Sequence, residues 1–196
     1  HDLGIRAVEF DVRQLKDHEL IIMHDDNMLR TTGIDQALYP LNSTQLDTYN
    51  QAHIWLDWEK QSTPTLRQAL QIMQDFEHLE VEVKAVETQA EAERLTQHLT
   101  QQLRGFEHSA VITSFDLKIL QALQDQHSTF KRGLLIEDDI QHLAIEQALK
   151  YDCCQIGWMN QLATDDLLKA TQQANLAISV WTVNDIERAK HLRDCG

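Results

Sequence analysis

The chain is organised around Val8-Glu9-Phe10-Asp11-Val12, an apolar run that carries two acids. Glu9 and Asp11 are two residues apart, so in a strand both carboxylates would lie on one face. Two acids on one face of an otherwise buried strand repel each other and are costly to remove from water. A bound cation would remove both penalties, and hard divalent cations prefer oxygen ligands. An ion pair of one acid with Arg6 or Arg13 is the alternative that this run leaves open.

A second apolar run, residues 20–23, leads directly into His24 and Asp25. The other histidines lie on polar segments, whereas His24 ends an apolar strand close to the two acids. An imidazole can gain and lose a proton near neutral pH. His24 is therefore the predicted general acid or base.

A later run, residues 79–84, repeats the pattern of acid, apolar residue and charged residue with Glu82 and Lys84. If its strand neighbours the first acidic strand, three carboxylates can meet around one Ca²⁺ or Mg²⁺. Lys84 would then be a point charge for a substrate anion, and an ion pair of Lys84 with Glu82 or Asp11 is the alternative. We expect Glu80 on the opposite face, toward a helix or solvent. The predicted ligands of the cation are Glu9, Asp11 and Glu82.

Composition limits the classes of function. The 196 residues are enough for a single domain, residues 1–196, with a sizeable core. The formal net charge of −14 argues against nucleic acid as a partner, because phosphate contacts need a basic surface. No apolar run approaches 18 residues, so we expect no stable membrane insertion. The three cysteines, Cys153, Cys154 and Cys195, are expected to be reduced, buried thiols of a cytoplasmic protein.

Apolar runs alternate with amphipathic helical patterns along the whole chain, which is typical of a (β/α) barrel or an open doubly wound sheet. No Gly-rich phosphate-binding turn follows any strand, which lowers the expectation of a dinucleotide-binding sheet. Residues 25–62 form a long loop over the expected active-site face, with a short helix near residues 43–49 capped by Ser43. Strands are expected at 7–12, 20–23, 79–84, 110–113, 133–136, 153–156 and 177–181, and helices at 64–76, 88–103, 116–123, 140–151, 164–174 and 185–193.

Polar and aromatic residues gather where the predicted strands end, which in parallel barrels is the face that carries active sites. Phe115 and Trp181 follow or end two of the later strands. Each is interpreted either as a core residue or as a contact to the substrate.

Several blocks resemble glycerophosphodiester phosphodiesterases, and they arrive in the order of that family along the whole chain. The first block is carried by Val8-Glu9-Phe10-Asp11-Val12, Lys16-Asp17, Ile22-Met23-His24-Asp25 and Leu29-Arg30-Thr31-Thr32-Gly33. Later blocks are Pro64-Thr65-Leu66, Val81-Glu82-Val83-Lys84, Ile112-Thr113-Ser114-Phe115-Asp116 and Val180-Trp181-Thr182-Val183-Asn184.

The resemblance implies a (β/α)8 TIM barrel that hydrolyses glycerophosphodiesters, as small-molecule substrates, to sn-glycerol 3-phosphate and an alcohol in glycerol and phospholipid metabolism. It implies one divalent cation, Ca²⁺ or Mg²⁺, held by Glu9, Asp11 and Glu82. It also implies that His24 is one of two acid–base histidines and that Lys84 helps to bind the phosphate.

Two blocks of the family have no match here. The family begins with H-R-G and P-E-N-T, which carry the other histidine and an arginine, and it continues with V-D-G-I-I-T-D on the eighth strand. His1 is followed by Asp2-Leu3, so it does not match the first block. We therefore expect a segment of a longer chain without the first and eighth strands, and as given it should not turn over substrate at a rate typical of the family.

Two other functions stay open. A same-fold phospholipase, of the phosphatidylinositol or sphingomyelinase D type, could use Tyr49, Trp55 and Trp58 as a lipid-facing rim. The second open function is that of a non-catalytic barrel that binds a phosphorylated ligand. The presence of all four candidate residues, Glu9, Asp11, Glu82 and His24, argues against it. The sequence sets neither the alcohol moiety nor the oligomeric state.

Overall fold

The structure is a computed structural model that describes residues 3–195, and it divides into two compact units. Unit 1 comprises residues 3–84 and 94–110, and unit 2 comprises residues 85–93 and 111–195. The expectation about His1 lies outside the described residues. Within residues 3–195, the helices are all too short or too polar to span a bilayer.

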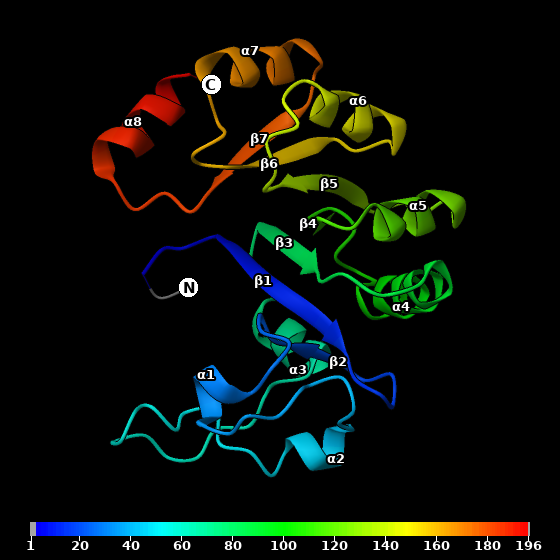
Figure 1. Cartoon of the computed structure of the whole chain (residues 1–196), viewed down its shortest axis with the longest axis vertical. Helices are drawn as coiled ribbons and strands as arrows, with labels where there is room; N and C mark the ends of the chain where they lie inside the picture. Colours follow the sequence, from blue (N-terminus) through cyan, green and yellow to red (C-terminus); the bar gives the residue numbers. More distant parts are fainter. Residues whose placement is uncertain (1–2, 196) are drawn as a thin grey trace. The chain divides into compact units, whose positions relative to one another are not determined.

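Strand β1 (Ala7–Gln14) is the central strand of unit 1 (Figure 1). It pairs in antiparallel fashion with the short β2 (Leu20–Ile22) and in parallel with β3 (His78–Val83). The predicted neighbourhood of the two acidic strands is therefore confirmed. The parallel register sets Asp11 beside Glu82.

The face of each β3 side chain follows from the two-residue period of a strand. Leu79, Val81 and Val83 are fully buried on one face. Glu80 and Glu82 therefore share the other face, and Glu80 pairs in register with Glu9 of β1. The expectation that Glu80 faces away from Glu82 is wrong, because residues two apart in a strand point the same way.

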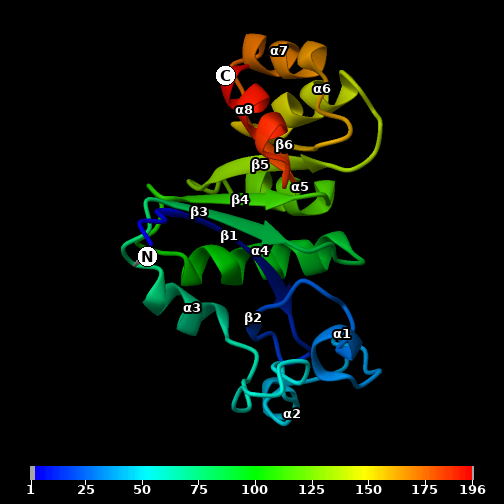
Figure 2. The same cartoon turned by 90° about the vertical axis from the view of Figure 1, so that its left-hand side faces the viewer.

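Four helices belong wholly or mostly to unit 1 (Figure 2): α1 (Leu29–Thr32), α2 (Ser43–Leu46), α3 (Leu66–Ile72) and α4 (Gln89–Gln102). The long loop between β2 and α3 forms a small core with the strands, because Met28, Leu38 and Leu46 are buried in one cluster with Leu15, Ile21 and Met23. The cap of α2 is Asn42, not Ser43: its side chain accepts from the backbone N–H of Gln45 in a capping box.

Unit 2 alternates parallel strands with helices, as predicted. Its strands, β4 (Ala110–Ser114), β5 (Lys131–Ile136), β6 (Gln155–Met159) and β7 (Ala177–Trp181), pair successively in parallel. Its helices are α5 (Leu117–Asp125), α6 (Leu143–Lys150), α7 (Asp165–Gln173) and α8 (Ile186–Asp194).

Strand β6 begins two residues later than expected. Asp152 has a φ of 53°, and the N–H of Cys153 donates to the carbonyl of Ala148 at 2.9 Å. This is the way in which a helix ends through a left-handed residue. Cys153 therefore completes the end of α6 instead of opening the strand.

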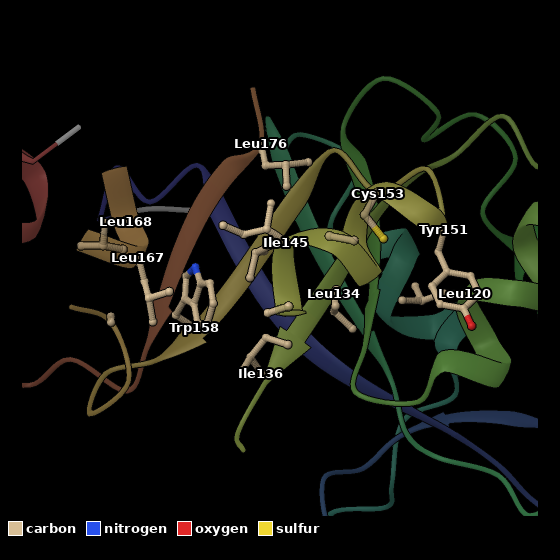
Figure 3. Close-up of a cluster of buried hydrophobic side chains, with 14 residues drawn as sticks. Leu120, Leu134, Ile136, Ile145, Tyr151, Cys153, Trp158, Leu167, Leu168 and Leu176 are labelled. Carbon is tan, nitrogen blue, oxygen red and sulfur yellow. The ribbon is translucent and has the colours of Figure 1, made fainter. Parts of the chain in front are cut away.

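The core of unit 2 lies between its strands and helices (Figure 3). Trp158 is fully buried there, and its indole N–H donates to the hydroxyl of Thr171 at 3.2 Å. All three cysteines are free thiols, as expected. Only Cys153 is buried, however, while Cys154 is exposed and Cys195 is half-buried.

Candidate functional site

The structure brings three acids together in unit 1. Glu9 and Asp11 project from one face of β1, and Glu82 projects from the same face of β3. One carboxylate oxygen of each lies within 4.8 Å of the other two. Carboxylate oxygens so close together are donors that Ca²⁺ and Mg²⁺ prefer, so the residues fit such a cation.

Lys84 lies inside this acidic cluster. Its Nζ is 2.6 Å from Oδ1 of Asp11 and also forms an ion pair with Oε1 of Glu82. Both ion pairs of the alternative interpretation are thus present. The cluster nevertheless holds three acids against one lysine, so Lys84 leaves negative charge unbalanced.

Burial and mutual repulsion disfavour the ionised acids. Partial burial, and after it the charges of Asp11 and Glu82, together raise the pKa of Glu9 to about 7. Burial also raises the pKa of Glu82, against the opposing effects of Lys84 and of His24. A divalent cation would offset both causes, which makes this face a candidate metal site.

His24 follows β2 and is held by Asp25. Its Nδ1 is 2.8 Å from Oδ1 of Asp25, and Asp25 accepts from Nε and Nη2 of Arg30 at 2.6 and 3.1 Å. The hydrogen bond from Arg30 is the largest reason why the pKa of Asp25 falls to about 2. An ionised carboxylate only accepts hydrogen bonds, so Nδ1 carries a proton, and in the neutral imidazole Nε2 is then the nitrogen with the free electron pair. His24 can therefore accept a proton through Nε2.

Arg13 and a strand hydrogen bond fix the position of His24. Arg13 donates to the backbone carbonyl of His24 through Nε at 3.0 Å and Nη2 at 2.8 Å. The N–H of Met23 donates to the carbonyl of Asp11 at 3.0 Å, which ties the end of β2 to the acidic strand.

Sequence reasoning missed these positioning roles. Arg13 was expected only as a partner for an acid, although its place two residues after Asp11 on the acidic face is a signal that the sequence contains. The pairing of Arg30 with Asp25 depends on the turn into α1, which no residue pattern reveals.

Phe115 and Trp181 meet each other in unit 2. Their ring centroids are 5.4 Å apart in an edge-to-face arrangement, and the indole N–H of Trp181 donates to the carbonyl of Gly157 at 3.2 Å. A Cβ on Gly157 would lie 2.4 Å from Cδ2 of Leu135, so a larger residue at this position would require the Leu135 side chain to move. Their contact with a substrate stays a prediction.

Known proteins with similar sequences and folds place this chain in a family. The model of the glycerophosphoryl diester phosphodiesterase family matches residues 1–196. The chain is 27% identical over 185 residues to the uncharacterized protein MG293 of Mycoplasma genitalium, covering 91% of this chain and 75% of that protein.

Solved structures of similar fold include several phosphodiesterases with a TIM-barrel fold. A phosphodiesterase of Oleispira antarctica, solved with the product sn-glycerol-3-phosphate, superposes with a TM-score of 0.86 at 20% identity, covering 100% of this chain and 80% of that one. A glycerophosphodiester phosphodiesterase of Agrobacterium tumefaciens has a TM-score of 0.75 at 23% identity, covering 98% and 81%. The fold class is therefore confirmed as a TIM barrel, and the match over the whole chain shows that this chain belongs to the glycerophosphoryl diester phosphodiesterase family.

Proposed function

We propose that this chain carries the cation site and one acid–base histidine of a metal-dependent hydrolase that converts glycerophosphodiesters to sn-glycerol 3-phosphate and an alcohol. The observation that supports it best is the trio of carboxylate oxygens within 4.8 Å of one another. Glu9, Asp11 and Glu82 would hold one Ca²⁺ or Mg²⁺. When bound, such a cation would supply polarisation of a phosphoryl oxygen.

Lys84 is the proposed phosphate contact. Its Nζ touches two of the three acids, so a phosphate held at those acids would also meet the ammonium group. An ammonium is a compact charge suited to phosphate oxygens. Phe115 and Trp181 are proposed to contact the remainder of the substrate.

His24 is the proposed acid–base residue of this chain. The ionised Asp25 keeps the proton on Nδ1, so Nε2 can take a proton from an attacking hydroxyl group or return it to a leaving oxygen. The exposure of the side chain, 66%, leaves this nitrogen accessible to a substrate. The anchored backbone of His24 limits the positions that the ring can take.

The proposal is tested by following sn-glycerol 3-phosphate release from a soluble glycerophosphodiester. The sample is the full-length protein. A chelator of divalent cations should abolish release, and added Ca²⁺ or Mg²⁺ should restore it. Release that continues at full rate with the chelator would contradict the proposal.

An exposed apolar group in the long loop favours a second candidate, hydrolysis of phosphodiesters at a lipid surface. Ile54, Trp55, Leu56 and Trp58 are all exposed, with Leu56 at 94%. Exposed groups of this kind often mark a lipid or protein contact. Tyr49, expected on the same rim, instead packs against the small core of the loop.

Sedimentation with phospholipid vesicles tests this second candidate. The unaltered chain should sediment with the vesicles, and the double substitution Trp55→Ala and Trp58→Ala should remove that binding. If the unaltered chain stays in the supernatant, the lipid-directed function is wrong.

A further inference from the structure

We propose that Asp165, His191 and Cys195 form a second metal site, one for Zn²⁺, that joins α7 to α8. Nε2 of His191 is 2.7 Å from Oδ1 of Asp165 and 3.6 Å from Sγ of Cys195. One ligand atom of each residue lies within 4.8 Å of the other two. The site belongs to unit 2 and shares no residue with the acidic cluster.

The spacing of the donor atoms suits a tetrahedral ion. With Zn–S near 2.3 Å and Zn–N near 2.05 Å, two tetrahedral ligands have their donor atoms about 3.6 Å apart. The distance from Sγ of Cys195 to Nε2 of His191 is 3.6 Å already. The distance from Nε2 to Asp165 would have to widen from 2.7 Å to about 3.4 Å, which rotation of two largely exposed side chains allows.

The local structure holds these donors in place. His191 and Cys195 are four residues apart at the end of α8, so they lie on one face of the helix. The side-chain amide of Gln172 donates to the carbonyl of Cys195 at 2.7 Å and ties this end of α8 to α7. Asp165 opens α7, and Figures 1 and 2 both show the two helices side by side.

The donor set selects the kind of ion. Thiolate, imidazole and carboxylate together match the borderline-soft Zn²⁺, whereas the three carboxylates of unit 1 match Ca²⁺ or Mg²⁺. Binding requires the Cys195 thiol to lose its proton to solvent and His191 to present the electron pair of Nε2, so uptake of Zn²⁺ releases protons. A water molecule would complete four ligands.

A metal bridge would stabilise a helix that has little apolar packing. No residue of α8 is fully buried, and near its end only Leu192 and Cys195 pack partly against the core of unit 2. Most helical stability in proteins comes from such packing, so α8 has little of it. An ion that links α8 to the start of α7 would supply a fixed connection.

The test replaces Zn²⁺ by Co²⁺, whose bond to a thiolate gives a charge-transfer absorption that carboxylate ligands do not give. We expect this absorption with the unaltered chain, and we expect Zn²⁺ to displace it. Cys195→Ser and His191→Gln should each remove it. Cys154→Ser is the matched control, because Cys154 is an exposed thiol outside the site, and it should keep the absorption.

Thermal unfolding tests the role of the ion as a bridge. Zn²⁺ should raise the Tm of the unaltered chain and of Cys154→Ser, but not that of Cys195→Ser. Cys195→Ser should weaken Zn²⁺ binding by more than about 100-fold. The loss of a ligand should cost more than the loss of a hydrogen-bond partner of a ligand, which lowers metal affinity by about 10–100-fold. An absent absorption, or one that survives Cys195→Ser, would overturn the site. An absorption without any rise in Tm would overturn the bridge.

Discussion

His24 combines an ionised partner, a fixed backbone and an accessible ring nitrogen. We expect His24→Ala to lower kcat of the whole natural protein by about 10²–10⁴-fold with a smaller effect on KM, because the residue acts on protons in the transition state. Steady-state rates on a soluble glycerophosphodiester measure this. His108→Ala, at an exposed histidine, is the control and should keep the rate. An unchanged kcat in His24→Ala would remove His24 from the proposed chemistry.

Asp25 makes the stability of the chain depend on acid pH. Its pKa falls from the ordinary value of 3.8 to about 2, mainly through the hydrogen bond from Arg30. The folded state therefore favours the ionised form, and this stabilisation is complete above pH 4 and is lost as the pH falls through about 2. Asp25→Asn should unfold more readily than the unaltered chain at pH 7.

The measurement is denaturant unfolding of both proteins from pH 7 down to pH 2. The difference in free energy of unfolding between them should shrink across the acid window. A difference that stays constant from pH 7 to pH 2 would show that the Asp25 carboxylate is not stabilised in this way.

At the scale of the elements, the contact of β5, β6 and β7 depends on Gly157. An added methyl group there would lie 2.4 Å from Cδ2 of Leu135 of β5 and 3.0 Å from the hydroxyl oxygen of Ser179 of β7. We expect Gly157→Ala to cost about 1–3 kcal/mol of unfolding free energy, the usual cost of overpacking. Ser179 lies on the same face of β7 as Trp181 and accepts a hydrogen bond from the side-chain amide of Gln155. Its replacement in Ser179→Ala removes this hydrogen bond and should cost about 1 kcal/mol. Denaturant unfolding compares the two, and a smaller loss in Gly157→Ala would contradict the account.

Much of the element order was predictable because two signals are local. Strands such as β3 show the two-residue alternation of buried apolar and polar residues, and α5 starts at a cap, Asp116, whose side chain accepts from the N–H of Lys118 as a cap should. The start of β6 was not predictable, because the left-handed turn at Asp152 draws Cys153 into the end of α6. Apolar content alone cannot separate a helix end from a strand start.

The candidate site was predictable where it follows from strand period and register. The prediction that Asp11 and Glu82 lie together required only that their strands be neighbours, and β1 does pair with β3. The face of the Glu80 side chain was predicted wrongly, although the two-residue period of a strand gives this face. The link from Arg30 through Asp25 to His24 needs the path of the chain after β2, and no spacing encodes it.

At the scale of the molecule, the two units carry different parts of the proposed chemistry. Unit 1 contains the acidic cluster, Lys84 and His24, while unit 2 contains Phe115 and Trp181. The acids come from β1 and β3, which pair directly within unit 1. The proposed cation site therefore lies wholly within unit 1, in a chain whose net charge of −14 favours cations.

The central claim is that the acids on β1 and β3 bind a divalent cation, and calorimetric titration of this chain with Ca²⁺ and with Mg²⁺ tests it most directly. One of the two ions should bind at a single site in the unaltered chain, and Glu82→Gln should weaken that binding by more than about 100-fold. Glu80→Gln, two residues away on the same strand face, should keep the affinity within about tenfold. Equal affinities in the unaltered chain and Glu82→Gln, or no binding of either ion, would contradict the account.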